Sequence, residues 1–359
     1  MSPSLETATS HGVMQNKRPS SPPKPEAAAR LLKLIQVRLI SEAIRVAAAL
    51  GVADLLADGP KSAGQLAEAT GACALSLLRV LRALVSFGVF SQEPDGRFAL
   101  APPGELLKRE EAGSLYSAAM FFGGEAGAKV VGVLLECIRT GETALGKLAE
   151  GDWVAWMQSD PERTGLFNAM TTAEASLHLT GVLESYDFAP TLKIVDVGGG
   201  HGKIISEILK RNPGMRGVLF DLPHAFDGGQ KAITQAGLAE RCEVVSGDFF
   251  VSVPAGADTY LLSRVIHDWD DEKAVAILRN VRGAMAPDGR LVLLETMLRP
   301  GDGPVYPFLS DLNMLLLTGG RERTEAEYDE IYRTARFKLT KTVATRSPTG
   351  TTVIEGRPI

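Results

Sequence analysis

A run of glycines in the middle of the chain is the first feature whose residue types and spacing could bind a ligand. Residues 198–202 read Gly-Gly-Gly-His-Gly, after a predicted strand at 193–197 and before a predicted helix at 203–210. Asp196 precedes the run, which gives the spacing Asp-x-Gly-x-Gly-x-Gly. Glycines at a strand-to-helix turn let the backbone approach a nucleotide-like ligand closely. A tight turn alone would also explain the glycines, but the flanking elements favour a ligand.

Acidic residues after the next strands indicate which ligand. A dinucleotide fingerprint needs a glycine at position 203, which is lysine, and the chain has no triphosphate-binding loop. Asp221 can accept hydrogen bonds from ribose hydroxyls, and Asp248 from an adenine amino group that Phe249 covers. Asp196, Asp221 and Asp248 are expected to end their strands in register. Three acids repel phosphates and suit a sulfonium and an ammonium, which predicts S-adenosylmethionine.

A histidine after the fourth predicted strand is the candidate catalytic residue. His267 lies in the run Ser-Arg-Val-Ile-His-Asp-Trp, just past residues 259–262. Ligands of open α/β sheets bind at this edge. The pKa of free histidine is about 6.5 and that of phenol about 10, so a histidine would take the proton as the new bond forms. A carboxylate from Glu295 or Glu322 could orient the imidazole; alternatively, His267 only caps a helix.

These residues need a parallel sheet to bring them together. Strands are predicted at residues 193–197, 218–221, 243–246, 259–262 and 290–295, with helical patterns between them. This alternation predicts an α/β, Rossmann-like domain over residues 186–359. Two further β-like runs, 338–343 and 351–355, predict an antiparallel C-terminal hairpin.

The N-terminal third is predicted to be a separate domain. Residues 1–28, rich in Ser, Pro and Ala, predict a disordered tail. Residues 29–110 show three helical patterns and a hairpin, the outline of a winged helix. DNA binding is one use of that outline, but Arg79 and Arg82 are the only cations of the candidate recognition helix, so packing against another subunit is favoured. Residues 111–185 predict a helical connector whose apolar side chains form core or line a pocket.

Composition excludes several other classes. The net charge is -5, which gives no basic footprint for nucleic acid. Three separated cysteines show no disulfide or metal spacing and indicate a cytoplasmic protein. No apolar run approaches the ~20 residues of a membrane span. We therefore expect no membrane partner and no metal.

Six runs together carry a family resemblance: VDVGGGHG, FDLPH, GDFF, SRVIHDWDDE, LLETML and GGRERT. They resemble, in order, the motifs of dimeric small-molecule O-methyltransferases, which include plant caffeate and flavonoid enzymes, acetylserotonin methyltransferase and antibiotic-tailoring enzymes. The resemblance covers residue 30 to the end. It implies a homodimer, an N-terminal winged-helix-like dimerisation domain and a C-terminal domain that binds S-adenosylmethionine.

The resemblance also implies site residues. Plant relatives carry lysine where this chain has Ser263, followed by Arg264, so whether these two contact the cofactor by side chain or backbone stays open. His267 would be the general base, flanked by Glu295 and Glu322. The predicted cofactor set is Asp196, Gly198, Gly200, Asp221, Leu222, Asp248, Phe249, Ser263 and Arg264. The predicted acceptor set is Phe167, Met170, Asp268, Asp311, Asn313 and Met314.

The sequence thus predicts an S-adenosylmethionine-dependent O-methyltransferase. Its acceptor would be a phenolic or enolic hydroxyl of a small, largely apolar secondary metabolite. Two alternatives stay open: methylation of nitrogen or carbon on the same fold, and a non-enzymatic winged-helix regulator that binds DNA.

Overall fold

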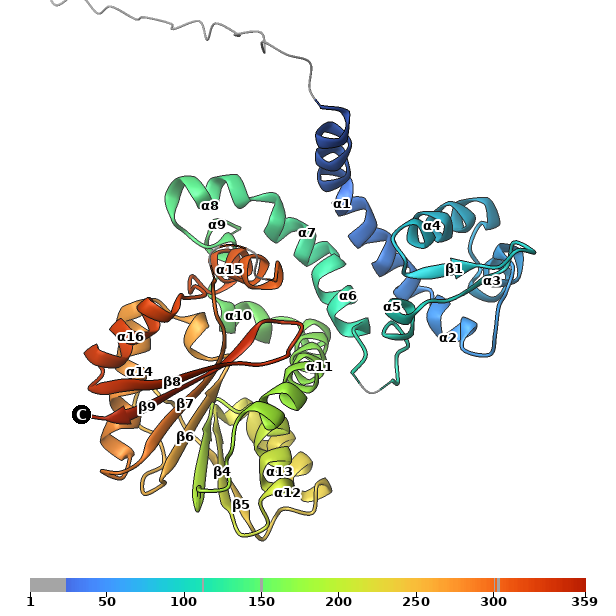
Figure 1. Ribbon diagram of the computed structural model, residues 1–359. Helices are drawn as coiled ribbons and strands as arrows, with labels where there is room; N and C mark the ends of the chain where they lie inside the picture. Colours follow the sequence, from blue (N-terminus) through green and yellow to red (C-terminus); the bar gives the residue numbers. More distant parts are fainter. Residues whose placement is uncertain (1–23, 112, 149–150, 300, 302–303) are drawn as a thin grey trace, which may run out of the picture.

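A computed structural model describes residues 24–359 except 112, 149–150, 300 and 302–303. A small N-terminal domain stands beside a larger α/β domain, with a layer of helices between them (Figure 1). The predicted tail lies outside the described residues up to residue 23. Its predicted end at residue 28 is wrong, because the first helix begins at Pro25, and proline is favoured at a first helical position.

The N-terminal domain has the predicted helices followed by a hairpin. Its third helix is capped at the N-terminus by Ser62, which forms a capping box with Gln65, and at the C-terminus by the left-handed Gly71. The apolar faces of the helices meet in one core with the hairpin. The elements are α1 (Pro25–Ala49), α2 (Val52–Leu56), α3 (Ala63–Thr70), α4 (Ala74–Ser86), β1 (Phe90–Gln92), β2 (Phe98–Leu100) and α5 (Pro102–Glu105).

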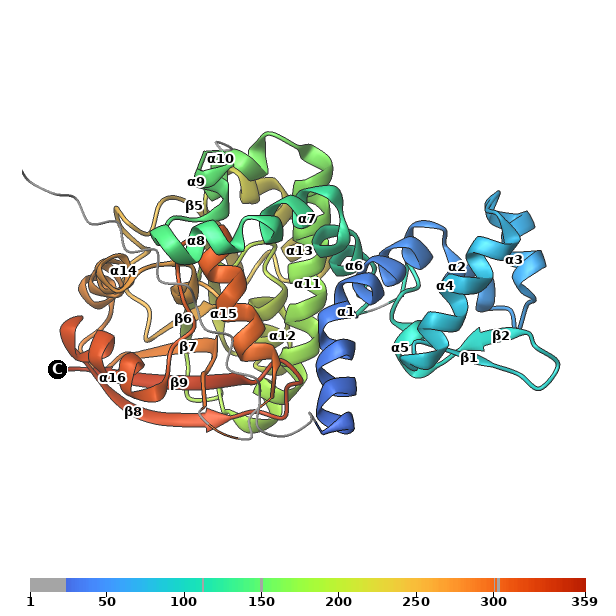
Figure 2. The ribbon, with the colours of Figure 1, turned by 90° about the horizontal axis from the view of Figure 1, so that it is seen from above.

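A layer of helices links the two domains. Helix α15 (Tyr306–Leu317) comes from the α/β domain but contacts α7, α8 and α9, so it belongs to this layer by packing (Figure 2). A cluster of aromatic and aliphatic side chains forms its core. The linking helices are α6 (Tyr116–Gly123), α7 (Glu125–Gly132), α8 (Leu134–Thr140), α9 (Ala144–Lys147), α10 (Trp153–Gln158) and α11 (Pro161–Ser185).

The α/β domain contains a seven-stranded sheet of order β5-β4-β3-β6-β7-β9-β8. Strands β3 to β7 pair in parallel, whereas β9 runs antiparallel to β7 and β8. The predicted strands and the C-terminal hairpin are confirmed. The strands are β3 (Lys193–Val197), β4 (Arg216–Asp221), β5 (Cys242–Ser246), β6 (Thr259–Ser263), β7 (Arg290–Thr296), β8 (Phe337–Ala344) and β9 (Thr351–Pro358).

Helices cover both faces of this sheet. Helices α11, α12 (Lys203–Arg211) and α13 (Phe226–Gln235) pack on one face. Helices α14 (Asp271–Ala284) and α16 (Glu325–Thr334) pack on the other. Two short 3-10 helices follow strands of this sheet. η1 (Pro223–Ala225) follows β4, and η2 (Ile266–Asp268) follows β6. Because β4 and β6 leave on opposite sides of β3, the sheet has a switch point at the carboxyl ends of β3 and β6, where ligands of such sheets bind.

No single helix in the described part of the chain is long and apolar enough to cross a membrane. Helices α3 and α4, bent by 118°, satisfy the length and composition criterion only as a pair. Leu66, Leu77, Leu81 and Leu84 of this pair are buried in the N-terminal core.

Candidate active site

The glycine loop is shaped by backbone conformations that suit glycine. Gly198, Gly200 and Gly202 have φ of 70°, 56° and 73°, where other residues are strained. The Gly200 amide donates a hydrogen bond to Asp221 Oδ2 at 2.7 Å. A Cβ atom on Gly198 would lie 2.8 Å from Val265 Cγ2 and 3.8 Å from the Phe249 ring. The loop therefore joins β3, the end of β4 and the segment that precedes His267.

Two of the predicted acids lie at the ends of neighbouring strands. Asp221 ends β4 and accepts a hydrogen bond from the Leu222 amide at 2.7 Å. Asp248 follows β5 and accepts one from the Phe250 amide at 2.8 Å. These backbone donors fix both carboxylates, and each retains lone pairs for a ligand. The Phe249 ring packs edge-on against Phe250, with centroids 5.0 Å apart.

The third acid lies elsewhere, so the prediction that all three end their strands in register is wrong. Asp196 is the penultimate residue of β3 and pairs with Leu219, not with Asp221. Its side chain lies under the loop, because a Cβ atom built on Gly199 would be 2.6 Å from Asp196 Oδ2. Asp196 is only 1% exposed. Burial, and then the charge of Asp221, raise the pKa of Asp196 to about 7. Neither carboxylate oxygen of Asp196 has a hydrogen-bond partner among the described residues, so Asp196 lies behind the loop and not in the ligand crevice.

His267 sits on η2 with both ring nitrogens facing carboxylates. Nδ1 lies 3.0 Å from Glu322 Oε1, and Nε2 lies 3.6 Å from Asp268 Oδ1. Burial raises the pKa of Glu322, but the charges of His267 and Arg264 outweigh this effect and lower it to about 2. The ionised Glu322 carboxylate therefore fixes a proton on Nδ1 and leaves Nε2 to accept one. Burial and Arg264 lower the pKa of His267, but the nearby carboxylates outweigh them, so the net pKa is raised.

Of the two acids predicted to orient the histidine, Glu322 is the direct hydrogen-bond partner. Glu295, fully buried on β7, instead uses Oε1 to accept hydrogen bonds from the amides of Val265 at 3.1 Å and Ile266 at 2.8 Å. It thereby holds the backbone just before His267. Burial raises the pKa of Glu295.

Arg264 belongs to the Glu322 cluster. Its guanidinium donates to Thr296 Oγ1 at 2.6 Å, to Glu322 Oε1 at 3.0 Å and to Ser310 Oγ at 3.1 Å. Its φ of 55° is rare for a side-chain-bearing residue and costs roughly 1–2 kcal/mol. The side chain of the predicted cofactor residue Arg264 is thus committed to Glu322. Ser263 Oγ is buried and has no partner among the described residues.

Sequence reasoning missed a buried arginine that supports the site. Arg323 is 0% exposed and donates to the carbonyls of Ile266 at 3.1 Å and Trp269 at 2.7 Å. The Arg321 amide donates to the His267 carbonyl at 2.8 Å. The run GGRERT therefore contributes a backbone clamp as well as Glu322. The alternating charges of this run were the only sequence signal for a supporting role, but alternating charges are equally typical of a solvated loop.

The cluster of His267, Glu295 and Glu322 also has the spacing of a cation site, because one ligand atom from each lies within 4.8 Å of the others. The guanidinium of Arg264 already places positive charge on Glu322 Oε1, the oxygen that faces His267. Arg264 can therefore offset the charge of Glu322 within this cluster.

Residues predicted to face the acceptor come from α11 and α15, except Asp268, which lies on η2. The Phe167 ring lies 5.0 Å from Trp153 and 5.6 Å from Phe121. Met170 on α11 is buried in the linking layer. On α15, Met314 is buried and Asn313 is half-buried. Asp311 has a structural contact, since its Oδ1 accepts a hydrogen bond from the Glu322 amide at 2.9 Å.

Comparison with known proteins identifies the family. Residues 143–338 match the O-methyltransferase domain, and residues 32–110 match the O-methyltransferase dimerisation domain. The chain belongs to the O-methyltransferase family. This O-methyltransferase is 38% identical to the phenazine O-methyltransferase PhzM of Lysobacter antibioticus over 92% of its own length and 96% of the relative's.

Two further likenesses bear on the chemistry. The O-methyltransferase is 33% identical to the 8-amino-8-demethylriboflavin N,N-dimethyltransferase of Streptomyces davaonensis over 89% of its length and 93% of the relative's. It superposes with a TM-score of 0.83 on the calicheamicin-biosynthesis methyltransferase CalO1, solved with SAH bound, at 30% identity, covering 94% and 100% of the two chains.

The O-methyltransferase uses S-adenosylmethionine as its methyl donor, as this family does. The residues present fit that cofactor. A Cβ atom built on Gly200 would meet no atom within 4 Å, so the loop backbone there is open to a close ligand. The carboxylates of Asp221 and Asp248 suit a ligand rich in hydroxyl and amino donors.

Proposed function

We propose that this O-methyltransferase works as a homodimer that methylates a phenolic or enolic hydroxyl of a small, largely apolar secondary metabolite, with His267 as the general base. The observation that carries the proposal is the pairing of His267 Nδ1 with Glu322 Oε1 at 3.0 Å. It leaves Nε2 as the basic atom at the carboxyl edge of the sheet.

Each group then has one task. The cofactor supplies an electrophilic methyl group when bound. Asp221 and Asp248 would hold its nucleoside, Phe249 would cover its base, and the backbone at Gly198 and Gly200 would approach it. Leu222 follows Asp221 directly, and Ser263 ends β6. His267 Nε2 takes the hydroxyl proton, and Glu322 stabilises the resulting imidazolium through Nδ1–H.

The acceptor is proposed to be planar and aromatic. Trp153 and Phe167, which are only partly buried in the aromatic cluster, are available to line its site. Phe121 and Trp156 complete the core behind them. The relative from Lysobacter antibioticus is named for phenazines, and a hydroxyphenazine is therefore a suitable first probe. Asp268, 3.6 Å from His267 Nε2, would face the same end of the acceptor.

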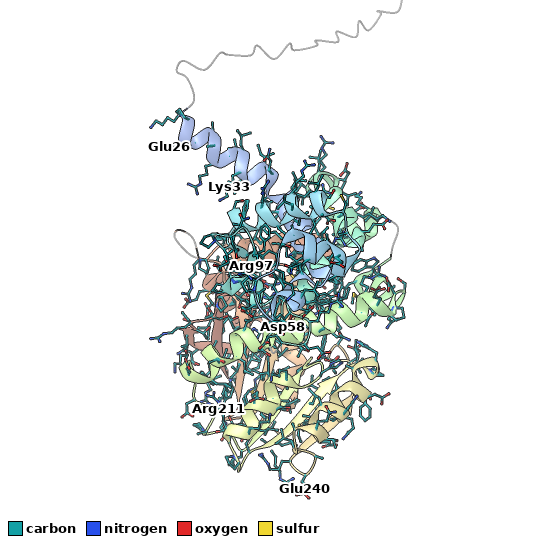
Figure 3. The ribbon with its side chains drawn as sticks, turned by 90° about the vertical axis from the view of Figure 1, so that its right-hand side faces the viewer. Glu26, Lys33, Asp58, Arg97, Arg211 and Glu240 are labelled. Atoms are coloured by element: carbon teal, nitrogen blue, oxygen red, sulfur yellow. The ribbon has the colours of Figure 1, made fainter. Side chains whose placement is uncertain are left out.

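The homodimer is proposed from the exposed apolar side of α1. Four large aliphatic side chains, Leu31, Leu32, Ile35 and Leu39, are 58%, 59%, 65% and 69% exposed. Figure 3 shows this part of α1, marked by Glu26 and Lys33, standing clear of the body. A stripe of this kind is expected to be covered by a second copy, since the segment lies in the dimerisation domain. We place the enzyme in the cytoplasm, where free cysteines such as Cys137 and Cys242 persist.

Methylation of nitrogen is the second candidate, because one relative is an N,N-dimethyltransferase. An aromatic amine attacks through a lone pair that is already free and needs no base beforehand. A phenol needs to lose its proton, and the base pair of His267 and Glu322 serves that need. The geometry therefore favours oxygen.

A labelled-methyl assay separates these candidates. Purified protein is incubated with labelled S-adenosylmethionine and matched pairs of hydroxy- and aminophenazines, and the methyl position of each product is determined by NMR. Label on oxygen that depends on His267 supports the proposal. Label only on nitrogen, or salt-sensitive binding to duplex DNA without any transfer, would replace it.

A further inference from the structure

The described part of the chain contains one guanidinium that reaches the histidine–glutamate pair, and the role proposed for His267 does not use it. Arg264 follows the last residue of β6, and its amide donates to the Leu294 carbonyl at 3.0 Å. The left-handed backbone at φ 55° then turns its side chain toward β7 and α15. This rare backbone conformation therefore occurs directly after β6, in the segment that leads to His267.

The guanidinium bridges three elements. Nη1 donates to Thr296 on β7 at 2.6 Å and to Glu322, before α16, at 3.0 Å, while Nη2 donates to Ser310 on α15 at 3.1 Å. Ser310 Oγ in turn donates to the same Glu322 oxygen at 2.6 Å. Glu322 Oε1 thus accepts hydrogen bonds from Arg264 and Ser310 in addition to its contact with His267.

We infer that Arg264 is a positioning residue for the base: its guanidinium fixes the Glu322 carboxylate, and thereby the Nδ1–H tautomer of His267 that presents Nε2 to the acceptor. The inference rests on the proposed function of His267. It differs from the expectation from the sequence, in which Arg264 contacts the cofactor.

The charges around His267 give Arg264 a measurable signature. The groups that face the imidazole are Asp268 on η2, Glu295 on β7, Glu322 before α16, and Arg264 itself. The three carboxylates raise the pKa of His267, whereas Arg264 lowers it. Removing the guanidinium should therefore raise the pKa of His267, while removing the Glu322 charge should lower it.

The experiment is a histidine NMR titration of the full chain labelled with ¹⁵N-histidine. The chain has five histidines, and a His267→Gln variant assigns the signal. In the wild type we expect the neutral ring to carry its proton on Nδ1. In Arg264→Met we expect the pKa of His267 to rise, the Nδ1–H signature to weaken and S-adenosylmethionine affinity to change less than about threefold. Methyl transfer should fall about 10- to 100-fold in kcat, the usual cost of loosening a supporting contact.

A second variant separates charge from geometry and covers a failure of Arg264→Met to fold. Arg264→Lys keeps the positive charge but cannot present two donors in a fixed fork. It should leave the pKa of His267 near the wild-type value and lower kcat about tenfold.

Two results would overturn the inference: an unchanged His267 signal in Arg264→Met, or full activity in Arg264→Lys. A wild-type protein that transfers no methyl group would contradict the proposed function instead, and the titration would still test the coupling between Arg264 and His267.

Discussion

The Nδ1 atom of His267 lies 3.0 Å from Oε1 of Glu322, and both side chains are almost completely buried. This contact fixes the tautomer of the histidine and stabilises its protonated form. Because the pKa of Glu322 is lowered to about 2, the carboxylate stays ionised throughout the range in which His267 titrates.

The pH dependence of methyl transfer should show this pairing. His267 accepts a proton only when it is neutral, so activity should fall as pH drops through its pKa. That pKa is raised above the usual 6.5, and the acid limb of kcat should therefore lie above pH 6.5. A pH–rate profile checks this, and a limb below pH 6 would contradict the assignment.

Glu322→Gln should move that limb. The neutral amide removes a negative charge that raises the pKa of His267, so the limb should shift to lower pH. Activity at the optimum should drop about 10- to 100-fold because the amide no longer stabilises the imidazolium. Glu327→Gln is the matched control, since Glu327 caps α16 and has no contact with His267; an equal effect in both variants would argue against a special role for Glu322.

Gly198→Ala should weaken binding of S-adenosylmethionine by tenfold or more. Its Cβ would lie 2.8 Å from Val265 Cγ2, which forces the loop or the segment before His267 to move. Gly237→Ala is the matched control: its φ is the same 70°, and no atom lies within 4 Å of its Cβ. Both should lose roughly 1–2 kcal/mol of folding stability. Calorimetric titration should find the affinity loss in Gly198→Ala alone.

Asp196→Asn should change how folding stability depends on pH. The folded pKa of Asp196 is raised to about 7 from 3.8, so ionisation of the buried carboxyl costs stability as pH rises through this interval. Between pH 5 and pH 8 the asparagine variant should gain about 2.5 kcal/mol of stability relative to the wild type. Urea unfolding at the two pH values measures the difference; a constant offset would show that Asp196 does not titrate there.

Charged substitutions on α1 should separate the proposed dimer. Ile35→Glu with Leu39→Glu places two carboxylates on the exposed apolar stripe, whose side chains would each contribute about 1.5–3 kcal/mol when buried. Analytical ultracentrifugation should show a monomer. Leu192→Glu is the control, because Leu192 is 76% exposed on the catalytic domain. A dimer that survives the α1 changes would place the interface elsewhere.

The fold was largely predictable because apolar strands and amphipathic helices alternate regularly from residue 193 onward. His267 and the glycine loop were predictable for the same reason, since both follow strand ends. The position of Asp196 was not predictable. Neighbouring residues on a strand point to opposite faces, so a shift of one position along the strand moves a side chain between the ligand crevice and the core.

The partner of His267 also depended on tertiary packing. Glu295 and Glu322 both approach the histidine, and only the folded chain shows that Glu295 binds the Val265 and Ile266 amides while Glu322 meets the ring. The direction of Arg264 follows from a left-handed backbone, which no local sequence signal marks for an arginine.

The most direct test of the central claim is single-turnover transfer of labelled methyl to a hydroxyphenazine by wild-type protein and His267→Ala, each saturated with S-adenosylmethionine. We predict a rate at least about 10²-fold lower in the variant, with cofactor affinity nearly unchanged. An undiminished rate in His267→Ala would contradict the role of His267 as the base.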